Sequence, residues 1–488
     1  MTATTTLLDE LDREAEAFDG AISREHYLNG SGQKDDLELA PIYARHSRLF
    51  SRETVDELER AGRGDERYPE LRRLAVEGYL DHAANEVTEA LSSRETKDVV
   101  EWDGAQVPYR SVAPLVRNEA DIARRHALER KLSEATAAQN ELRERRWDVL
   151  YARARDLGYT TYRAMVEDIG RLDVEGLAGI VGTFLRQTEK PYRRQLAQYL
   201  TGIGVDPAHA EKSDLAYLFR SPEFDEYFAA DRLVDVYQRS MTALGFTGDA
   251  QRHIVLDVEN RPKKSPRAFC SPVVIPDEIY LVISPQGGEY DYGAMFHEGG
   301  HSQHFAHADR ALPFALRGLG DNSVTEGFAF VLEHIISIPA WLDRHLGFGD
   351  PSAYLAMHRF NKLYMFRRYS AKLLYESELH AGNNVRGRQK RYADLLTAAC
   401  GVRYSPEDYL FDVDGAYYCA RYLRAWIFDA QMRRMLGDRF GPEWFARPEA
   451  GAALIELWSH GQRYDAPQLL AREHIGPLDV AALAAELT

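Results

Sequence analysis

The sequence predicts a mainly α protein of two lobes, in which a small β-sheet leads into a helix that carries two histidines. Three observations predict this fold. Stretches in which apolar residues recur at steps of three or four dominate the chain. Runs rich in valine and isoleucine are short and gather just before a His-Glu-x-x-His motif. The length of 488 residues allows a large core or two packed subdomains.

Helical signals dominate the first half of the chain. Residues 118–157 are rich in alanine, glutamate, arginine and leucine, and Gly158 follows as a stop, so one long helix or two in series fits. A second amphipathic stretch covers residues 223–244 and ends at Gly245, as a C-terminal cap would. We expect the second stretch to be a core helix.

Strand signals are few and local. Two short extended runs around an Asp-Gly pair at position 103 predict a hairpin over residues 99–110. Three further strands are expected at residues 253–258, 267–275 and 278–283, which are rich in valine and isoleucine. The sequence therefore predicts a small sheet directly before the helix that carries the histidines.

Bulk properties exclude several classes of partner. The formal net charge is -16 and no long block of lysine or arginine offsets it, so we expect no nucleic-acid partner. No run approaches the roughly 18 apolar residues that a membrane span requires, so no membrane partner is expected. Residues 1–20 lack a basic start and a continuous apolar stretch, which predicts a cytoplasmic location. The three cysteines follow no disulfide or metal-knuckle pattern.

The domain organisation is only weakly marked. A coarse division near residue 250 separates a helical N-terminal lobe, residues 1–250, from a lobe that carries the histidine motif, residues 251–488. No linker rich in proline, glycine or serine marks this boundary. We therefore expect one continuous body with two lobes, and a monomer or a homodimer as its assembly.

The clearest chemical signal is the His-Glu-x-x-His motif. On a helix, His297 and His301 lie one turn apart on the same face, so both imidazoles can reach one metal ion. Glu298 projects beside them, where it can act as the general base toward a metal-bound water. This five-residue motif can also occur by chance, so a third metal ligand is needed to support a metal site.

The third ligand is expected from the next helix. Catalytic zinc sites take three protein ligands and leave the fourth position to water. Glu326 follows His301 by 25 residues and stands next to Gly327, which lets helices approach closely. Ser323 and Glu326 also fit a capping box, in which the glutamate only reaches back to its own helix start. The histidine pair upstream favours the ligand interpretation.

Two further residues are candidates for supporting the metal site. Glu333 lies two turns beyond Glu326 on the same face, where it can hydrogen-bond a ligating histidine or be a surface charge. His304 points to a later turn of its helix, so we expect it to pack in the core or to support the ligands. The expected cofactor is one zinc ion per chain, although iron, cobalt or manganese can use the same ligands.

The segments around these residues resemble a known family. They are similar to the thimet oligopeptidase and oligoendopeptidase group of gluzincin metallopeptidases at residues 266–275, 297–304 and 326–333, which read Pro-Arg-Ala-Phe-Cys-Ser-Pro-Val-Val-Ile, His-Glu-Gly-Gly-His-Ser-Gln-His and Glu-Gly-Phe-Ala-Phe-Val-Leu-Glu. The C-terminal third, with an Arg-Tyr pair at 421–422, also resembles angiotensin-converting enzyme. The resemblance is one of motifs over residues 265–488 and is weak before them.

The resemblance implies a fold and an activity. The fold would be a mostly helical ellipsoid with a deep central channel, and the activity would be zinc-dependent hydrolysis of short peptides that enter it. Phe269 and Cys270 would lie on an edge strand that pairs with the substrate backbone. Tyr422 would donate a hydrogen bond to the oxyanion, and Tyr418 and Arg421 would lie near the substrate.

Two positions depart from the family pattern. Asp412 stands where the dipeptide-releasing relatives carry a substrate-binding histidine, and Leu410 stands where a lysine would bind a C-terminal carboxylate. Release of C-terminal dipeptides is therefore not expected. The same metal site could instead act on another amide or a specialised metabolite, or it could belong to a non-catalytic metal-binding protein. Glu298 argues against the last, because a structural site needs no general base and usually has four protein ligands.

Overall fold

The chain is mainly helical, with two small sheets, as the sequence predicts. The computed structural model describes residues 3–488. They form two compact units, each assembled from separate segments: the first from the residues up to Val76, Pro222–Leu355 and Arg424–Leu483, the second from Glu77–Ser221, Ala356–Leu423 and Ala484–Thr488. The lobe boundary near residue 250 and the central channel stay predictions.

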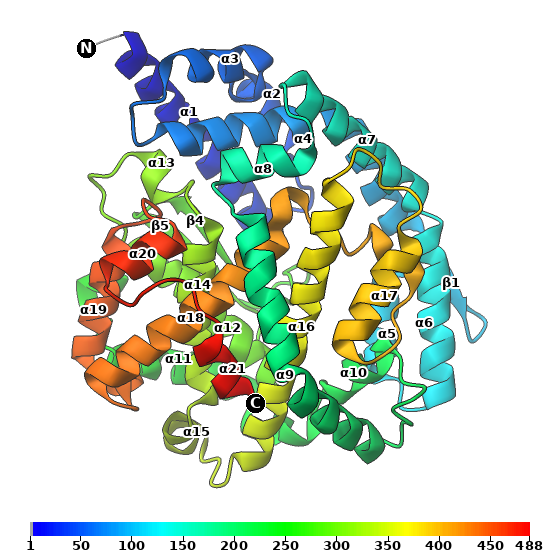
Figure 1. Ribbon diagram of the computed structural model, residues 1–488. Coiled ribbons are helices and arrows are strands. Elements are labelled where there is room, and N and C mark those ends of the chain that lie inside the picture. Colours follow the sequence, from blue (N-terminus) through cyan, green and yellow to red (C-terminus); the bar gives the residue numbers. More distant parts are fainter. Residues whose placement is uncertain (1–2) are drawn as a thin grey trace. The chain divides into compact units, whose positions relative to one another are not determined.

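Figure 1 shows the course of the chain and labels many of its elements. The first unit holds strands β3 (Ile254–Asp257), β4 (Phe269–Val274) and β5 (Glu278–Val282). Its helices are α1 (Ala3–Gly30), α2 (Ala40–Arg45), α3 (Arg52–Ala61), α11 (Leu233–Ala243), α12 (Glu289–Ala306), α13 (Phe314–Arg317), α14 (Asn322–Glu333), α15 (Pro339–Leu346), α19 (Pro448–Ser459) and α20 (Ala466–Arg472).

The second unit holds strands β1 (Val99–Trp102) and β2 (Ala105–Pro108). Its helices are α5 (Tyr109–Asn118), α6 (Ile122–Ala137), α7 (Asn140–Asp156), α8 (Tyr162–Gly170), α9 (Val174–Gly202), α10 (Lys212–Leu218) and α17 (Gln389–Cys400). Four helices contain residues of both units: α4 (Tyr68–Lys97), α16 (Ser352–His380), α18 (Tyr418–Phe440) and α21 (Ala481–Leu487). None of the helices in the described part of the chain is both long enough and apolar enough to cross a membrane.

The helical predictions hold with one correction. Helices α6 and α7 follow each other in series, as expected for residues 118–157. The stretch 223–244 is not one helix, because only α11 is α-helical and two short 3-10 turns precede it. The backbone between those turns accepts hydrogen bonds from the start of α12. Phe228 O accepts from Gly288 N (2.8 Å), and Ala229 O accepts from Tyr292 Oη (2.8 Å). Tertiary contacts with the start of α12 therefore override the local helical pattern.

The strand predictions are confirmed. Strands β1 and β2 pair antiparallel through a turn in which Asp103 and Gly104 both have positive φ, the conformation that a two-residue hairpin favours. The second sheet has the order β3-β5-β4, with β3 parallel and β4 antiparallel to β5. Strand β4 is thus an edge strand of its sheet, and it contacts both α1 and α12.

Helices α12 and α14 lie side by side and at unusually close range (Figure 1). A Cβ atom on Gly300 of α12 would lie 2.5 Å from Ala329 Cα of α14. On the other face of α14, a Cβ atom on Gly327 would lie 2.3 Å from the Phe428 ring. A side chain at either position would overlap its neighbour, so the glycines that weaken these helices locally are what let them pack.

The core of the first unit surrounds this helix pair. Helix α14 is buried on all sides from Ser323 to Leu332, which fits the apolar run of its second half. Large aromatic side chains contribute to this core, and the fully buried ones include Phe296, Phe328, Trp341, Phe428 and Trp458. A packed core at near-crystalline density leaves α12 and α14 little freedom to shift.

We expect Gly300→Ala to destabilise the protein by about 1–3 kcal/mol, because the added methyl group overpacks the contact between α12 and α14. The measurement is urea unfolding of the chelator-treated protein, followed by circular dichroism. Gly179→Ala on α9 is the matched control, since its Cβ meets nothing within 4 Å. The control should gain up to about 1 kcal/mol from helix propensity. Equal unfolding free energies for the two variants would contradict the close approach.

Candidate metal centre

Three predicted ligands converge in the first unit. Helix α12 supplies His297 and His301, and α14 supplies Glu326. Glu326 Oε2 lies 3.3 Å from His297 Nε2 and 3.7 Å from His301 Nε2. Potential ligand atoms of the three residues all lie within 4.8 Å of one another. Atoms at this separation can bind one metal ion with a small adjustment.

The outer nitrogens of both imidazoles are engaged. His297 Nδ1 lies 2.8 Å from Glu333 Oε2, and His301 Nδ1 lies 2.8 Å from Thr325 Oγ1. A hydrogen on Nδ1 leaves the lone pair on Nε2, the nitrogen that faces Glu326, available to a metal. This donor set and its orientation fit a divalent cation such as zinc. Glu333, predicted as a supporting residue or a surface charge, contacts a histidine directly.

The start of α14 is fixed by a residue that the sequence interpretation did not single out. The helix has Asp321 as its N-cap, and Asp321 Oδ1 accepts from Ser323 N (3.0 Å). Asp321 Oδ2 forms a buried ion pair with Arg424 of α18 (2.8 Å) and accepts from Ala466 N (3.3 Å). Ser323 is therefore not the cap, and the alternative capping-box interpretation of Glu326 is wrong.

Glu298 lies on α12 beside the histidines and is held by the sheet. Its Oε2 accepts a hydrogen bond from the backbone N–H of Cys270 on β4 (2.9 Å). Removal from water raises the pKa of Glu298 to about 7, against a smaller lowering effect of His297. A carboxyl group with a pKa near neutral can both take and return a proton. Part of the edge of β4 that was predicted to pair with substrate thus contacts Glu298.

The two histidines have unlike electrostatic surroundings. Burial lowers the pKa of His301 to about 3, because no carboxylate compensates fully for its removal from water. Burial acts on His297 too, but hydrogen bonds to Glu326 and Glu333 raise its pKa well above the usual value. The Phe330 ring packs against His297 with its centroid 4.9 Å away, so one side of the group is apolar.

His304 is a packing residue at the far end of the motif. Its Nε2 lies 3.0 Å from Gly461 O, and its ring packs edge-on against Phe328. The side chain is fully buried, and burial lowers its pKa to about 4. Of the two roles considered for His304, the core role agrees with these contacts.

The predicted substrate-side residues of α18 belong to the second unit. Tyr418 and Tyr422 are half-buried, with ring centroids 5.2 Å apart, and Tyr422 also packs against Tyr369 at 5.7 Å. Arg421 is 3% exposed. The roles of Tyr422, Tyr418 and Arg421 toward a substrate stay predictions, as does that of Phe269 in the first unit.

A strained turn precedes these tyrosines. Ala416 and Tyr417 both have positive φ, 50° and 53°, which costs of order 1–3 kcal/mol for a non-glycine residue. Hydrogen bonds hold the turn: Ala416 N donates to Tyr162 Oη (3.1 Å) and Tyr417 Oη donates to Glu376 O (3.2 Å). Tyr417 is fully buried, so it is a core aromatic residue.

Asp412 and Leu410, the two residues that differ from the family pattern, are both engaged inside the second unit. Asp412 accepts from Tyr392 Oη (2.9 Å) and pairs with Arg368. Nearby cations hold the pKa of Asp412 below its usual value despite its burial. Leu410 is 3% exposed and contributes to the core. Asp412 is therefore paired within the second unit, and Leu410 is buried there.

A second group of potential ligands lies in the second unit. Glu376, Asp414 and Cys419 have ligand atoms within 4.8 Å of one another. Glu376 already accepts from Asp414 N (3.0 Å) and from Cys419 Sγ (3.1 Å), and Lys372 Nζ lies 2.8 Å from Asp414 Oδ2. The ammonium group of Lys372 supplies the positive charge here, so this group does not resemble a metal site.

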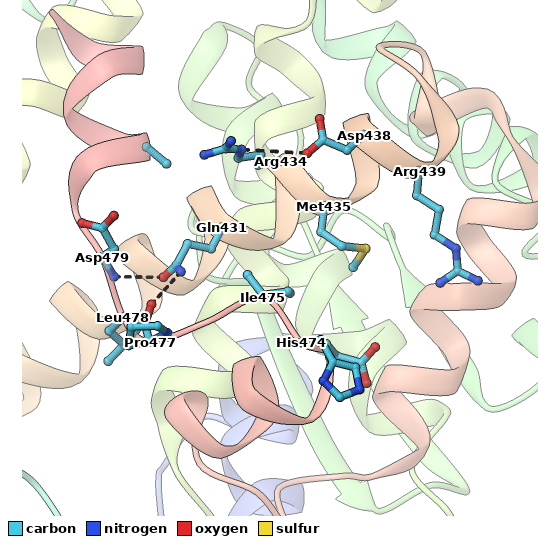
Figure 2. A pocket seen from close by; sticks show the side chains of 12 residues that line it. Gln431, Arg434, Met435, Asp438, Arg439, His474, Ile475, Pro477, Leu478 and Asp479 are labelled. Carbon is cyan, nitrogen blue, oxygen red and sulfur yellow. Dashed lines mark hydrogen bonds and ion pairs between the residues drawn. The ribbon is translucent and has the colours of Figure 1, made fainter.

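A cavity of about 870 Å³ lies between α18 and the segment that joins α20 to α21 (Figure 2). Gln431 holds that segment: its side chain donates to Pro477 O (2.9 Å) and accepts from Asp479 N (3.2 Å). Within the described part of the chain, the residues that line the cavity include none of the metal centre. The cavity is therefore separate from the candidate site.

Solved structures with this fold are known. The chain is similar to a protein described as an oligoendopeptidase F from Bacillus anthracis, with a TM-score of 0.68 and 13% identity over 97% of this chain and 88% of that one. Carboxypeptidases from Pyrococcus furiosus and Deinococcus radiodurans each match with a TM-score of 0.63 and 14% identity over 100% of this chain and 98% of theirs. The sequence matches no protein-family profile and no curated protein sequence. The chain therefore shares the fold of these peptidases.

We expect Asp321→Asn to destabilise the protein by about 3–5 kcal/mol, because asparagine keeps the helix cap but leaves the buried Arg424 charge unpaired. Arg344→Met is the control, since the Arg344–Glu443 pair is exposed and should contribute only about 0–1 kcal/mol. Chemical unfolding of both variants measures the difference. Equal losses would show that Asp321 does not anchor α14 through its charge.

Proposed function

We propose that the chain is a metallopeptidase that hydrolyses peptide bonds in short peptides, with His297, His301 and Glu326 as zinc ligands and Glu298 as general base. The observation that carries the proposal is the convergence of two Nε2 atoms and one carboxylate oxygen, with each Nδ1 already engaged on its outer side. The shared fold with known peptidases supports it independently.

Glu298 and Cys270 have distinct roles in the proposed hydrolysis. A bound zinc ion supplies a Lewis acid that polarises the scissile carbonyl and makes water more acidic. Glu298 takes the proton from the attacking water and returns it to the amine nitrogen of the leaving peptide. The Cys270 N–H keeps the Glu298 carboxylate oriented before substrate arrives, so little reorganisation is needed when the reaction begins.

The substrate side of the proposal relies on the predicted residues of α18 and β4. Tyr422 would donate its hydroxyl hydrogen to the developing oxyanion, which adds a fixed donor to the polarising effect of the metal. The Phe269 and Cys270 edge of β4 would pair with the peptide backbone. Because Asp412 is paired with Arg368 and Tyr392, it is poorly suited to bind a substrate terminus. Release of C-terminal dipeptides is therefore not part of the proposal.

We expect Glu298→Gln to keep the metal and to lower kcat/KM by about 10²–10⁴, because glutamine has the same shape but cannot accept the proton. Turnover of a quenched fluorescent peptide and zinc content by mass spectrometry are the two measurements. Glu449→Gln, an exposed glutamate on α19, is the control and should retain full activity. Full activity of the Glu298 variant would refute its assignment as the base.

We expect the zinc-loaded protein to cleave members of a quenched peptide library and to lose this activity on chelation. Added zinc should restore it, because chelation removes the ion and leaves the ligating side chains chemically unchanged. Stoichiometric zinc with no cleavage of any peptide would contradict the peptidase proposal and favour another amide or a non-catalytic role.

A further inference from the structure

Thr325 contacts a proposed metal ligand but has no role in the reaction described above. Its Oγ1 lies 2.8 Å from His301 Nδ1, and the residue is 6% exposed. The remaining ring neighbours of His301 cannot replace this contact, because Phe305 is apolar and His297 packs edge-on against it at 4.9 Å. Among the described residues, His301 Nδ1 therefore has the Thr325 hydroxyl as its hydrogen-bond partner.

We infer that Thr325 is a positioning residue that turns His301 so that Nε2, rather than Nδ1, faces the metal. A hydroxyl oxygen can accept the Nδ1 hydrogen and so fix the tautomer that presents a lone pair on Nε2. Glu333 does the same for His297 with a carboxylate. The inference rests on the proposed function, because it assigns a role toward the same metal.

The short side chain of Thr325 can reach His301 because the two helices approach so closely. Gly300, next to His301, leaves α12 in near contact with Ala329 of α14. At this separation a hydroxyl one bond beyond Cβ reaches the Nδ1 atom of His301. The glycine and the threonine therefore form one arrangement, in which the first sets the distance that the second bridges.

A neutral partner at this position also limits the negative charge around the metal. Glu326 and Glu333 already contact the histidines, and like charges at short range disfavour one another. A carboxylate in place of the Thr325 hydroxyl would add a third acidic group beside them. Threonine supplies the acceptor without that charge, so the two histidines differ in the strength of their outer hydrogen bonds.

The test is the zinc affinity of Thr325→Val, measured by competition with a chromophoric chelator. Valine keeps the shape but cannot accept the Nδ1 hydrogen, so we expect binding to weaken about 10- to 100-fold. Thr325→Ser keeps the hydroxyl and should restore most of the affinity. Thr325→Ala serves as a second variant without the hydroxyl, in case valine prevents folding.

Two controls are needed. One shows whether loss of any buried hydroxyl changes zinc affinity, and the other shows whether zinc binds at the proposed metal centre at all. Thr54→Val removes another buried hydroxyl of the first unit, which donates to Arg48 O, and should leave zinc affinity unchanged. His301→Ala should abolish tight binding. If Thr325→Val and Thr325→Ala bind zinc as tightly as the parent while His301→Ala does not, the inference is overturned and the proposed function stands. If His301→Ala also binds normally, the proposed metal centre fails with it.

Discussion

The close approach of α12 and α14 is the constraint on which the candidate site depends. Gly300 removes the side chain that would separate the helices, and Gly327 does the same on the opposite face of α14 against α18. At that distance, one helix can direct Thr325, Glu326 and Glu333 at the two histidines of the other. If a methyl group at position 300 pushed the two helices apart, these short contacts would move out of hydrogen-bonding range.

Buried polar groups around this helix pair keep it in register. Asp321 caps α14 and pairs with Arg424, so any rotation of the helix would break a buried ion pair. Strand β4 adds a second fixed point, because the Cys270 N–H holds the Glu298 carboxylate beside the histidines. Both anchors are contacts within the chain itself, so they limit how far α14 and the Glu298 carboxylate can move.

The sequence predicted the elements better than their contacts. Periodicity and turn residues predicted α6, α7, the hairpin and the three-stranded sheet, since these depend on local preferences. The stretch before α11 was predicted wrongly, because its backbone carbonyls bond to the start of α12, a contact that no local pattern encodes. Helical spacing predicted that His297 and His301 share one face and that Glu333 shares the face of Glu326, and the need of zinc for a third ligand predicted Glu326. Thr325 and Asp321 were missed, because their roles depend on which faces of separate helices meet.

A crystal structure of the zinc-loaded protein, with anomalous data at the zinc absorption edge, would show directly whether α12 and α14 hold the metal. We expect a single strong anomalous peak bonded to Nε2 of both histidines and to the Glu326 carboxylate, with no fourth protein ligand. A peak bonded to Glu376 and Cys419 instead, or a fourth side chain that closes the site, would contradict this expectation.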